Sequence, residues 1–255
     1  GIAASTRSAA AGGVTTIVEM PFDLTGPINS ADRFAVKREL AENEALVDVA
    51  LLGTLAPDGG WRSADALAEA GAVGFKVSLF DTDAHRFPRI TDAELRNVMA
   101  ATAGAGRTVA VHAENNEIVQ AMLAAERELN PFDPKAHVRS RPPISETMGV
   151  LTALEIAHEQ NARLHLCHLS LPRSVDLVQW YKSQGLDVTL ETCPHYLTFT
   201  QDDHDAQKGR LTINPPPPTA PGPAGTWERT PPHTPPPPPP PPTHDQPPSQ
   251  DPPPP

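Results

Sequence analysis

The chain has 255 residues and a formal net charge of −11, with 20 Lys and Arg against 31 Asp and Glu. This acidic balance argues against nonspecific nucleic-acid binding, which needs a basic surface. No apolar run approaches the roughly 18 residues of a membrane span, and no signal-peptide pattern opens the chain. The 2 cysteines are not spaced as CxxC and form no disulfide framework. We therefore expect a cytoplasmic protein.

Proline divides the chain into two parts. Of its 32 prolines, 22 lie in residues 215–255. A segment so rich in proline and so poor in aliphatic side chains cannot offset its own ordering entropy. We predict a folded domain over residues 1–216 and a disordered tail over 217–255, with no sheet or helix and few contacts to the domain.

Within the domain, short apolar runs alternate with segments of helical pattern. Ser30 is expected to cap the first long helix, and Thr91 with Glu94 forms a capping-box pattern at another. The predicted strands are 13–21, 46–55, 73–80, 108–113, 163–170 and 188–193, the first of them buried. The predicted helices are 30–43, 63–70, 91–103, 115–129, 145–160 and 172–184, with a loop over 130–143.

Six strands separated by helices predict βαβ units and a parallel sheet. The first four strands begin at about residues 13, 46, 73 and 108, and this spacing of roughly 30 residues fits a (β/α)₈ barrel of the TIM type, here about six units long. A doubly wound open sheet is the alternative. It normally carries a Gly-rich phosphate loop after its first strand, whereas Met20 to Asp23 follow here.

Four basic side chains lie within strands or at their carboxyl ends, where a barrel builds its active site. Lys76 lies inside an apolar strand, and a buried, unpaired ammonium is costly. His112 ends the fourth predicted strand, His168 nearly ends the fifth, and His195 lies just past the sixth. Converging imidazoles suit zinc-like metals. Each also has a structural reading: an interior salt bridge for Lys76, a hydrogen-bonded strand end for His112, and loop packing for His195.

The strand over 163–170 carries two histidines. Alternation along a strand places Leu164, Leu166 and His168 on one face and His165 with Cys167 on the other. We therefore expect His165 to be structural and to point away from a cavity shared by Lys76, His112 and His168.

Six short motifs, taken together and in order, resemble the cyclic amidohydrolases, a family that includes allantoinase, dihydroorotase and dihydropyrimidinase (hydantoinase). The resemblance covers about residues 1–216. The motifs are AGGVTTIVEMP (11–21), GAVGFKV (71–77), VHAEN (111–115), SRPP..E (140–146), LHLCHLS (164–170) and ETCPHYL (191–197).

This resemblance implies a barrel that holds two divalent metal ions, most often zinc, bridged by a carboxylated lysine. It gives the bridging role to Lys76 and ligand roles to His112 and His168. A desolvated, uncharged lysine can add CO₂, and the carbamate offers two oxygen ligands. The resemblance also implies substrate contacts for His195 and, through LTINPP (211–216), for Asn214. The substrate would be a small cyclic amide or ureide, and the full-length parent a homo-oligomer.

The motifs VEMP and GFK favour the allantoinase branch, which opens allantoin to allantoate, whereas INPP leans toward dihydroorotase; hydantoinase is a further alternative.

The family's HxH ligand pair would precede Gly1, and its general-base aspartate would follow residue 216. Neither has a counterpart among these residues, so we expect this chain to be inactive, its tail a frameshift or assembly product. A natural tail on a non-catalytic scaffold, binding SH3-type grooves as a polyproline helix, is the alternative of another class.

Overall fold

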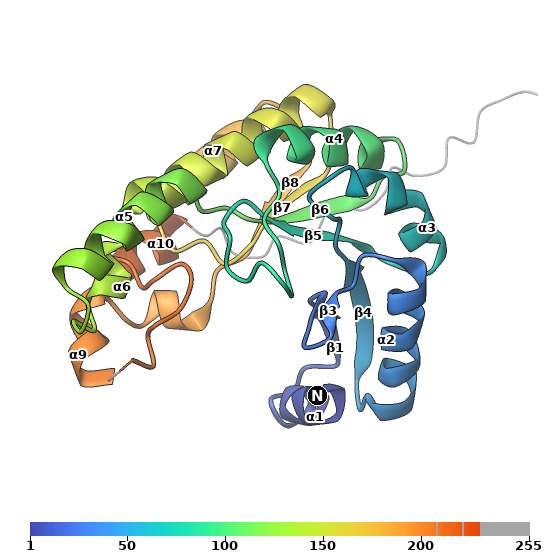
Figure 1. Cartoon of the computed structure of the whole chain (residues 1–255), viewed down its shortest axis with the longest axis horizontal. Coiled ribbons are helices and arrows are strands. Elements are labelled where there is room, and N and C mark those ends of the chain that lie inside the picture. The colour runs from blue at the N-terminus through green and yellow to red at the C-terminus, as the bar shows by residue number, and fades with distance from the viewer. Residues whose placement is uncertain (208, 221, 230–255) are drawn as a thin grey trace, which may run out of the picture.

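The computed structural model describes residues 1–207, 209–220 and 222–229 of the chain. An arch of parallel strands, covered by helices along its outer side, forms the body of the molecule (Figure 1). The six strands of the main sheet are β1 (Thr16–Glu19), β4 (Asp48–Gly53), β5 (Gly74–Ser78), β6 (Thr108–His112), β7 (Leu164–Leu166) and β8 (Val188–Leu190).

The strands lie in the sheet in the order of the sequence, β1-β4-β5-β6-β7-β8, and every neighbouring pair is parallel. This arrangement confirms the predicted βαβ units. A doubly wound sheet reverses direction at a switch point, and no reversal occurs among the described strands. A sequential parallel order with helices outside is the arrangement of a (β/α) barrel, here open between β1 and β8.

Most helices begin and end where the sequence pattern places them. The Ser30 hydroxyl accepts a hydrogen bond from the Arg33 backbone N–H at 3.4 Å, and Thr91 accepts one from Glu94 N–H at 3.2 Å, so both predicted caps form. The helices beside the sheet are α2 (Ala31–Glu44), α3 (Ala64–Glu69), α4 (Asp92–Ala103), α5 (Asn116–Leu129), α7 (Pro143–Gln160) and α8 (Pro172–Ser183).

Shorter elements complete the described fold. The helix α1 (Ile2–Ala11) precedes β1, and α6 (Ala136–Arg139) interrupts the loop predicted over 130–143. The remaining elements are β2 (Phe22–Asp23), β3 (Gly26–Pro27), η1 (Gly60–Ser63), η2 (Pro194–Leu197), η3 (Gln201–Asp203), α9 (His204–Gln207) and α10 (Gly222–Arg229). Among the described residues, none of the helices combines the length and the apolar character needed to cross a membrane.

Side chains alternate across the central strands and separate the core from the concave side. Phe75, Val111 and Leu166 belong to the apolar core that packs against the helices. Lys76 and Ala110, which pair across β5 and β6, face the opposite way and line a cavity on the concave side. Barrel chemistry takes place on this inner side and at the strand ends.

The first strand departs from the prediction. The prediction of a buried strand is wrong, because β1 alternates between exposed and half-buried residues. Its only hydrogen-bonded neighbour in the described sheet is β4. An edge strand lacks a second neighbour to cover its side chains, so Val18 stays 64% exposed despite its apolar character.

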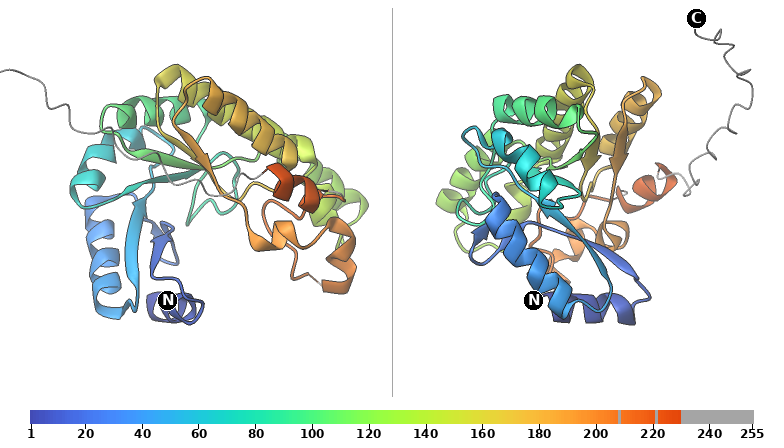
Figure 2. Two further views of the ribbon diagram at one scale, coloured as in Figure 1. Left: turned by 180° about the vertical axis from the view of Figure 1, so that it is seen from behind. Right: turned by 90° about the vertical axis from the view of Figure 1, so that its right-hand side faces the viewer.

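The predicted boundary at residue 216 is also wrong for the described residues beyond it. Pro217 and Pro218 are buried, and α10 packs against α8 and η2 (Figure 2). The Arg229 guanidinium pairs with Asp176 at 2.8 Å, and Gln179 donates to the Arg229 carbonyl at 2.5 Å. Proline has no backbone N–H, so its burial leaves no amide donor without a hydrogen-bond partner. Proline rings can therefore pack on the surface of an already folded domain. The predicted tail over 230–255 lies outside the described residues.

Candidate metal centre

The carboxyl ends of β5, β6 and β7 bring three predicted site residues together. Lys76 lies within β5, His112 ends β6, and His168 lies two residues beyond the end of β7. All three side chains line one cavity of about 280 Å³. Adjacent parallel strands present the same end to the same side of a sheet, which is why residues far apart in sequence meet here. The shared cavity agrees with the prediction from the strand pattern.

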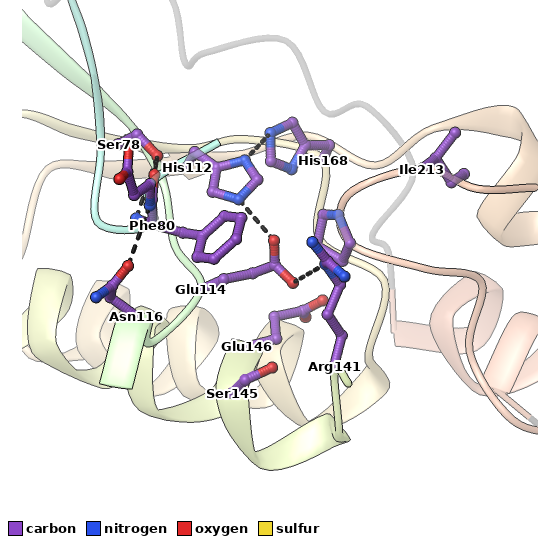
Figure 3. A network of polar contacts seen from close by, with 12 residues as sticks. Ser78, Phe80, His112, Glu114, Asn116, Arg141, Ser145, Glu146, His168 and Ile213 are labelled. Carbon is purple, nitrogen blue, oxygen red and sulfur yellow. Dashed lines mark hydrogen bonds and ion pairs between the residues drawn. The ribbon is translucent and has the colours of Figure 1, made fainter. Parts of the chain in front are cut away.

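The two imidazoles contact each other within a longer chain of polar groups (Figure 3). His112 Nδ1 lies 3.2 Å from His168 Nε2, and His112 Nε2 lies 2.7 Å from Glu114 Oε2. The Arg141 guanidinium reaches the other oxygen of Glu114 at 3.8 Å. Glu114 thereby fixes the ring of His112 from behind, as a carboxylate does for a metal-ligating histidine.

The distance between the two imidazole nitrogens suits a shared metal ion. Two imidazoles bound at 2.0–2.1 Å to one tetrahedral ion hold their nitrogens about 3.3 Å apart, close to the 3.2 Å between His112 and His168. The surroundings also hold buried polar atoms that lack a nitrogen or oxygen partner among the described residues, namely Lys76 Nζ, His168 Nδ1 and Asn214 Oδ1. The donor set therefore fits a metal centre.

Burial controls the protonation of the two histidines. Burial, followed by the charges of Lys76 and Arg141, lowers the pKa of His112 to about 3. Burial, Lys76 and His112 lower the pKa of His168 well below its ordinary value. Both rings are therefore neutral near pH 7, which is the state that binds a metal. Burial also raises the pKa of Glu114 to about 7, against the opposing charge of Arg141.

A second buried carboxylate, Glu146, holds the segment that carries His168. Its oxygens accept hydrogen bonds from Ser170 N–H and Oγ–H at 3.1 and 2.6 Å, from Ser174 Oγ–H at 2.6 Å and from Leu171 N–H at 3.2 Å. The carboxylate links the first turn of α7 to the chain beyond β7. It accordingly fixes the path of the backbone two residues after the candidate ligand.

Three residues of this site were not predicted as functional from their residue type and position in the sequence. Glu114, Arg141 and Glu146 are buried beside the predicted ligands, yet a lone acidic or basic residue in a loop carries no spacing signal of its own. All three lie inside motifs quoted for the family resemblance, Glu114 in VHAEN and the other two in SRPP..E. Their place in those motifs was the available signal.

His165 and His168 were predicted to lie on opposite faces, and this assignment is wrong. As predicted, His165 does not line the 280 Å³ cavity shared by Lys76, His112 and His168, but it lines the adjoining cavity together with Lys76 and His168. The strand ends at Leu166, and His168 has a φ of 44°, in the left-handed region. Alternation therefore does not extend to His168, whose side chain turns back to the inner side. Such a backbone conformation is uncommon and concentrates at functional sites.

The two predicted substrate contacts differ in their placement. Asn214 lines the same 280 Å³ cavity as Lys76, from a segment far along the chain. His195 lies in η2, half-buried, with its ring centroid 4.3 Å from that of Tyr196, and it lines neither of the two cavities that contain Lys76. The fold thus brings Asn214 to the candidate centre and leaves His195 in a packing contact.

Known proteins resemble the chain in sequence, although no family model matches it. It is 35% identical over 216 residues to an allantoinase of Deinococcus radiodurans, covering 85% of this chain and 48% of that protein. It is 34% identical over 210 residues to an L-hydantoinase of Paenarthrobacter aurescens, covering 82% of this chain and 45% of that protein. The chain thus spans about half the length of these curated relatives.

Solved structures agree with these similarities. An L-hydantoinase (dihydropyrimidinase) from Arthrobacter aurescens matches with a TM-score of 0.85 and 33% identity, over 90% of this chain and 50% of that one. A D-hydantoinase structure matches with a TM-score of 0.80 and 27% identity, over 89% of this chain and 50% of that one. Over the half of the family's length that it spans, the chain belongs to the cyclic amidohydrolases.

Proposed function

We propose that Lys76, His112 and His168 form part of a divalent-metal centre that, in the full-length parent, hydrolyses a cyclic amide or ureide. The observation that carries the proposal is the buried Lys76 Nζ, which has no nitrogen or oxygen partner among the described residues, beside two imidazole nitrogens 3.2 Å apart. Zinc is the ion that these donors suit best. A bound divalent ion supplies a nucleophilic water near neutral pH and polarises the amide carbonyl.

Lys76 would act as a carbamate. A neutral amine nitrogen would form a bond to the carbon of CO₂ while one C–O π pair moves onto oxygen, and the nitrogen would release one proton. The resulting carbamate would carry one negative charge shared by two oxygen ligands. At 4% exposure, the side chain is shielded from bulk water, and its Nζ has no nitrogen or oxygen hydrogen-bond partner among the described residues. The carbamate would hold the metal together with His112 and His168.

Glu114 and Asn214 would serve the centre in different ways. Glu114, 1% exposed, holds the ring of His112 so that its Nδ1 faces His168. Asn214 presents to the cavity an amide oxygen that has no hydrogen-bond partner within the described part of the chain, and this oxygen can accept a hydrogen bond from a ring N–H of a cyclic substrate. Both roles require only the positions that the side chains already hold.

Within the family, we propose an allantoinase-like substrate, a cyclic ureide. Support comes from the curated allantoinase relatives and from VEMP and GFK in the sequence. The INPP segment (213–216) supports dihydroorotate instead, and the L-hydantoinase relative supports a hydantoin or dihydropyrimidine.

The chain of 255 residues supplies three of the ligands that the family resemblance implies, and we propose that by itself it binds metal without turning over substrate. A non-catalytic scaffold is the competing proposal.

The test measures metal and turnover separately on the purified chain, with zinc and bicarbonate added. Bound zinc per chain is measured by elemental analysis after dialysis, and the addition of one CO₂ to Lys76 by peptide mass spectrometry. We expect bound zinc in the wild type and a lower zinc content per chain in Lys76→Ala, His112→Ala and His168→Ala. His85→Ala, which removes an exposed imidazole, is the matched control and should keep its zinc.

Turnover is then assayed on allantoin, dihydroorotate and dihydrouracil. We expect none, because a general base alone contributes about 10²–10⁴-fold to such reactions and the implied aspartate has no counterpart here. Robust hydrolysis of any of the three would overturn the proposed inactivity. Zinc content that is equal in the wild type and in all three ligand variants would overturn the proposed centre.

A further inference from the structure

A second group of potential metal ligands lies on the concave side of the sheet, beside the candidate centre. His165 belongs to β7, Cys167 follows that strand by one residue, and Glu191 follows β8 by one residue. One ligand atom from each side chain can be chosen so that all three lie within 4.8 Å of one another. None of these residues belongs to the Lys76, His112 and His168 set.

Neighbouring strands hold this group in place. His165 pairs with Thr189 in the β7–β8 register, and the Thr189 hydroxyl lies 2.8 Å from His165 Nδ1. The other ring nitrogen, Nε2, faces Glu191 Oε2 at 3.6 Å. Because Nδ1 already has a polar partner, Nε2 is the nitrogen available to a ligand. A hydroxyl that fixes the far nitrogen of an imidazole is a frequent companion of metal ligation.

The donor types identify the class of ion. An imidazole nitrogen, a cysteine sulfur and a carboxylate oxygen together suit a tetrahedral, thiophilic divalent ion. Three protein ligands leave one position open, and all three side chains line a cavity of about 460 Å³ into which that position can face. A thiolate and a carboxylate would balance the two charges of the ion, with one proton released from the thiol.

We propose that His165, Cys167 and Glu191 bind one thiophilic divalent cation, of the Zn²⁺ or Cd²⁺ type, at a site that adjoins the Lys76 centre and uses none of its ligands. The proposal does not rest on the proposed hydrolase function, because it uses none of the same ligands. Lys76 and His168 line the same cavity, so an ion held here would lie beside the centre without replacing it.

The test uses Co²⁺ as a spectroscopic substitute for zinc, with the full purified chain and no bicarbonate. Cobalt bound to a cysteine thiolate shows a sulfur-to-metal charge-transfer band in the near ultraviolet, which imidazole and carboxylate ligands do not give. We expect this band to saturate at one equivalent of Co²⁺ and to disappear in Cys167→Ser. Cys193→Ser is the matched control, since Cys193 is the other free cysteine, and it should keep the band.

Further variants separate this site from the candidate centre. His112→Ala, which removes a ligand of that centre only, should keep the charge-transfer band, whereas His165→Ala and Glu191→Gln should weaken Co²⁺ binding. Thr189→Val, which leaves the ligands intact but frees the far ring nitrogen, should weaken it about 10-fold. Circular dichroism of each variant establishes that the fold is retained. Absence of the band in the folded wild type, or its survival in Cys167→Ser, would overturn the proposal.

Discussion

The strands β1 and β5 belong to the same parallel sheet and have similarly apolar sequences, yet they differ sharply in burial. All five residues of β5 are buried, whereas β1 alternates between exposed and half-buried positions. The difference follows from their neighbours. β5 pairs with β4 on one side and β6 on the other, while β1 pairs with β4 alone among the described strands.

This contrast shows that the sequence of a strand does not determine its burial by itself. A β-branched, apolar run is typical of a strand covered on both faces, and β1 has that pattern without being covered, whereas β5, with Lys76 in its middle, is buried throughout. Position in the sheet decides whether the covering is present. The central strands, which carry Lys76 and His112, are therefore the part of the molecule where core packing and the candidate centre depend on each other.

The largest expected effect comes from removing a core side chain of the central strand. Phe75 is 0% exposed, and Phe75→Ala should lower the free energy of unfolding by about 3–5 kcal/mol, because it leaves a cavity that the core cannot fill. Val18→Ala on β1 should change it by no more than about 0.5 kcal/mol. Urea unfolding followed by circular dichroism measures both, and equal effects would contradict the contrast between the two strands.

The buried hydrogen bonds of Glu146 should matter next. Glu146→Gln replaces one accepting oxygen by an amide N–H₂ group that faces donors from Ser170, Leu171 and Ser174. We expect a loss of about 1–3 kcal/mol for each buried donor left without a partner. Glu159→Gln is the control, since Glu159 pairs with Arg96 on the surface and such pairs contribute about 0–1 kcal/mol. A smaller loss in Glu146→Gln than in the control would show that the segment beyond β7 is held by other contacts.

Close packing between α7 and the end of β6 gives a third, smaller expectation. A Cβ atom on Gly149 would lie 2.5 Å from the backbone carbon and oxygen of Ala113, so Gly149→Ala should cost about 1–3 kcal/mol through overpacking. Gly104, at the end of α4, has open space around it and a helical φ of −64°. Gly104→Ala should stabilise the chain by about 0.4–1 kcal/mol. Thermal unfolding of the pair tests whether the strain is specific to the central strands.

The smallest expected effect on stability, but a visible one on solubility, lies at the exposed edge. Val18→Lys should leave the free energy of unfolding within about 0.5 kcal/mol of wild type, while reducing self-association, because a charge on an edge strand opposes pairing with another chain. Val36→Lys, at a similarly exposed position on α2, is the control. Light scattering measures the difference, and an equal reduction in both variants would show that charge alone, rather than the strand edge, governs association.

Much of the fold could be predicted because local signals and the global arrangement agree. The caps at Ser30 and Thr91 form as expected, and the six strands lie in one parallel sheet. The helix α10 was missed because a proline-rich sequence predicts disorder only when no folded surface is available for it to pack against. Here α8 and η2 provide that surface. The residues around Pro217 find such a surface in the folded domain.

The candidate centre could be predicted only where a residue type is unusual for its place. Lys76 stands out inside an apolar strand, and His112 stands out at a strand end. His168 was placed on a face by an alternation that its backbone, at a φ of 44°, does not follow. Glu114 holds the His112 ring by a short polar contact between its carboxylate and His112 Nε2. The spacing of the two residues in the sequence does not by itself predict this contact. The burial and the partners of Glu114 depend on the tertiary structure.

The sequential strand order also has a consequence for how the chain folds. Each strand pairs with the strand of the next unit along the chain, as Thr16 does with Asp48 and Lys76 with Ala110. Folding slows as the average separation between contacting residues grows, and here each strand of the main sheet pairs with the next one along the chain. The connection between β6 and β7 is the exception in length, because it holds α5, α6 and α7. During synthesis, each newly made strand can pair with the strand of the preceding βα unit, which is already present. The candidate centre is then completed late, when β7 joins β6 and carries His168 to His112.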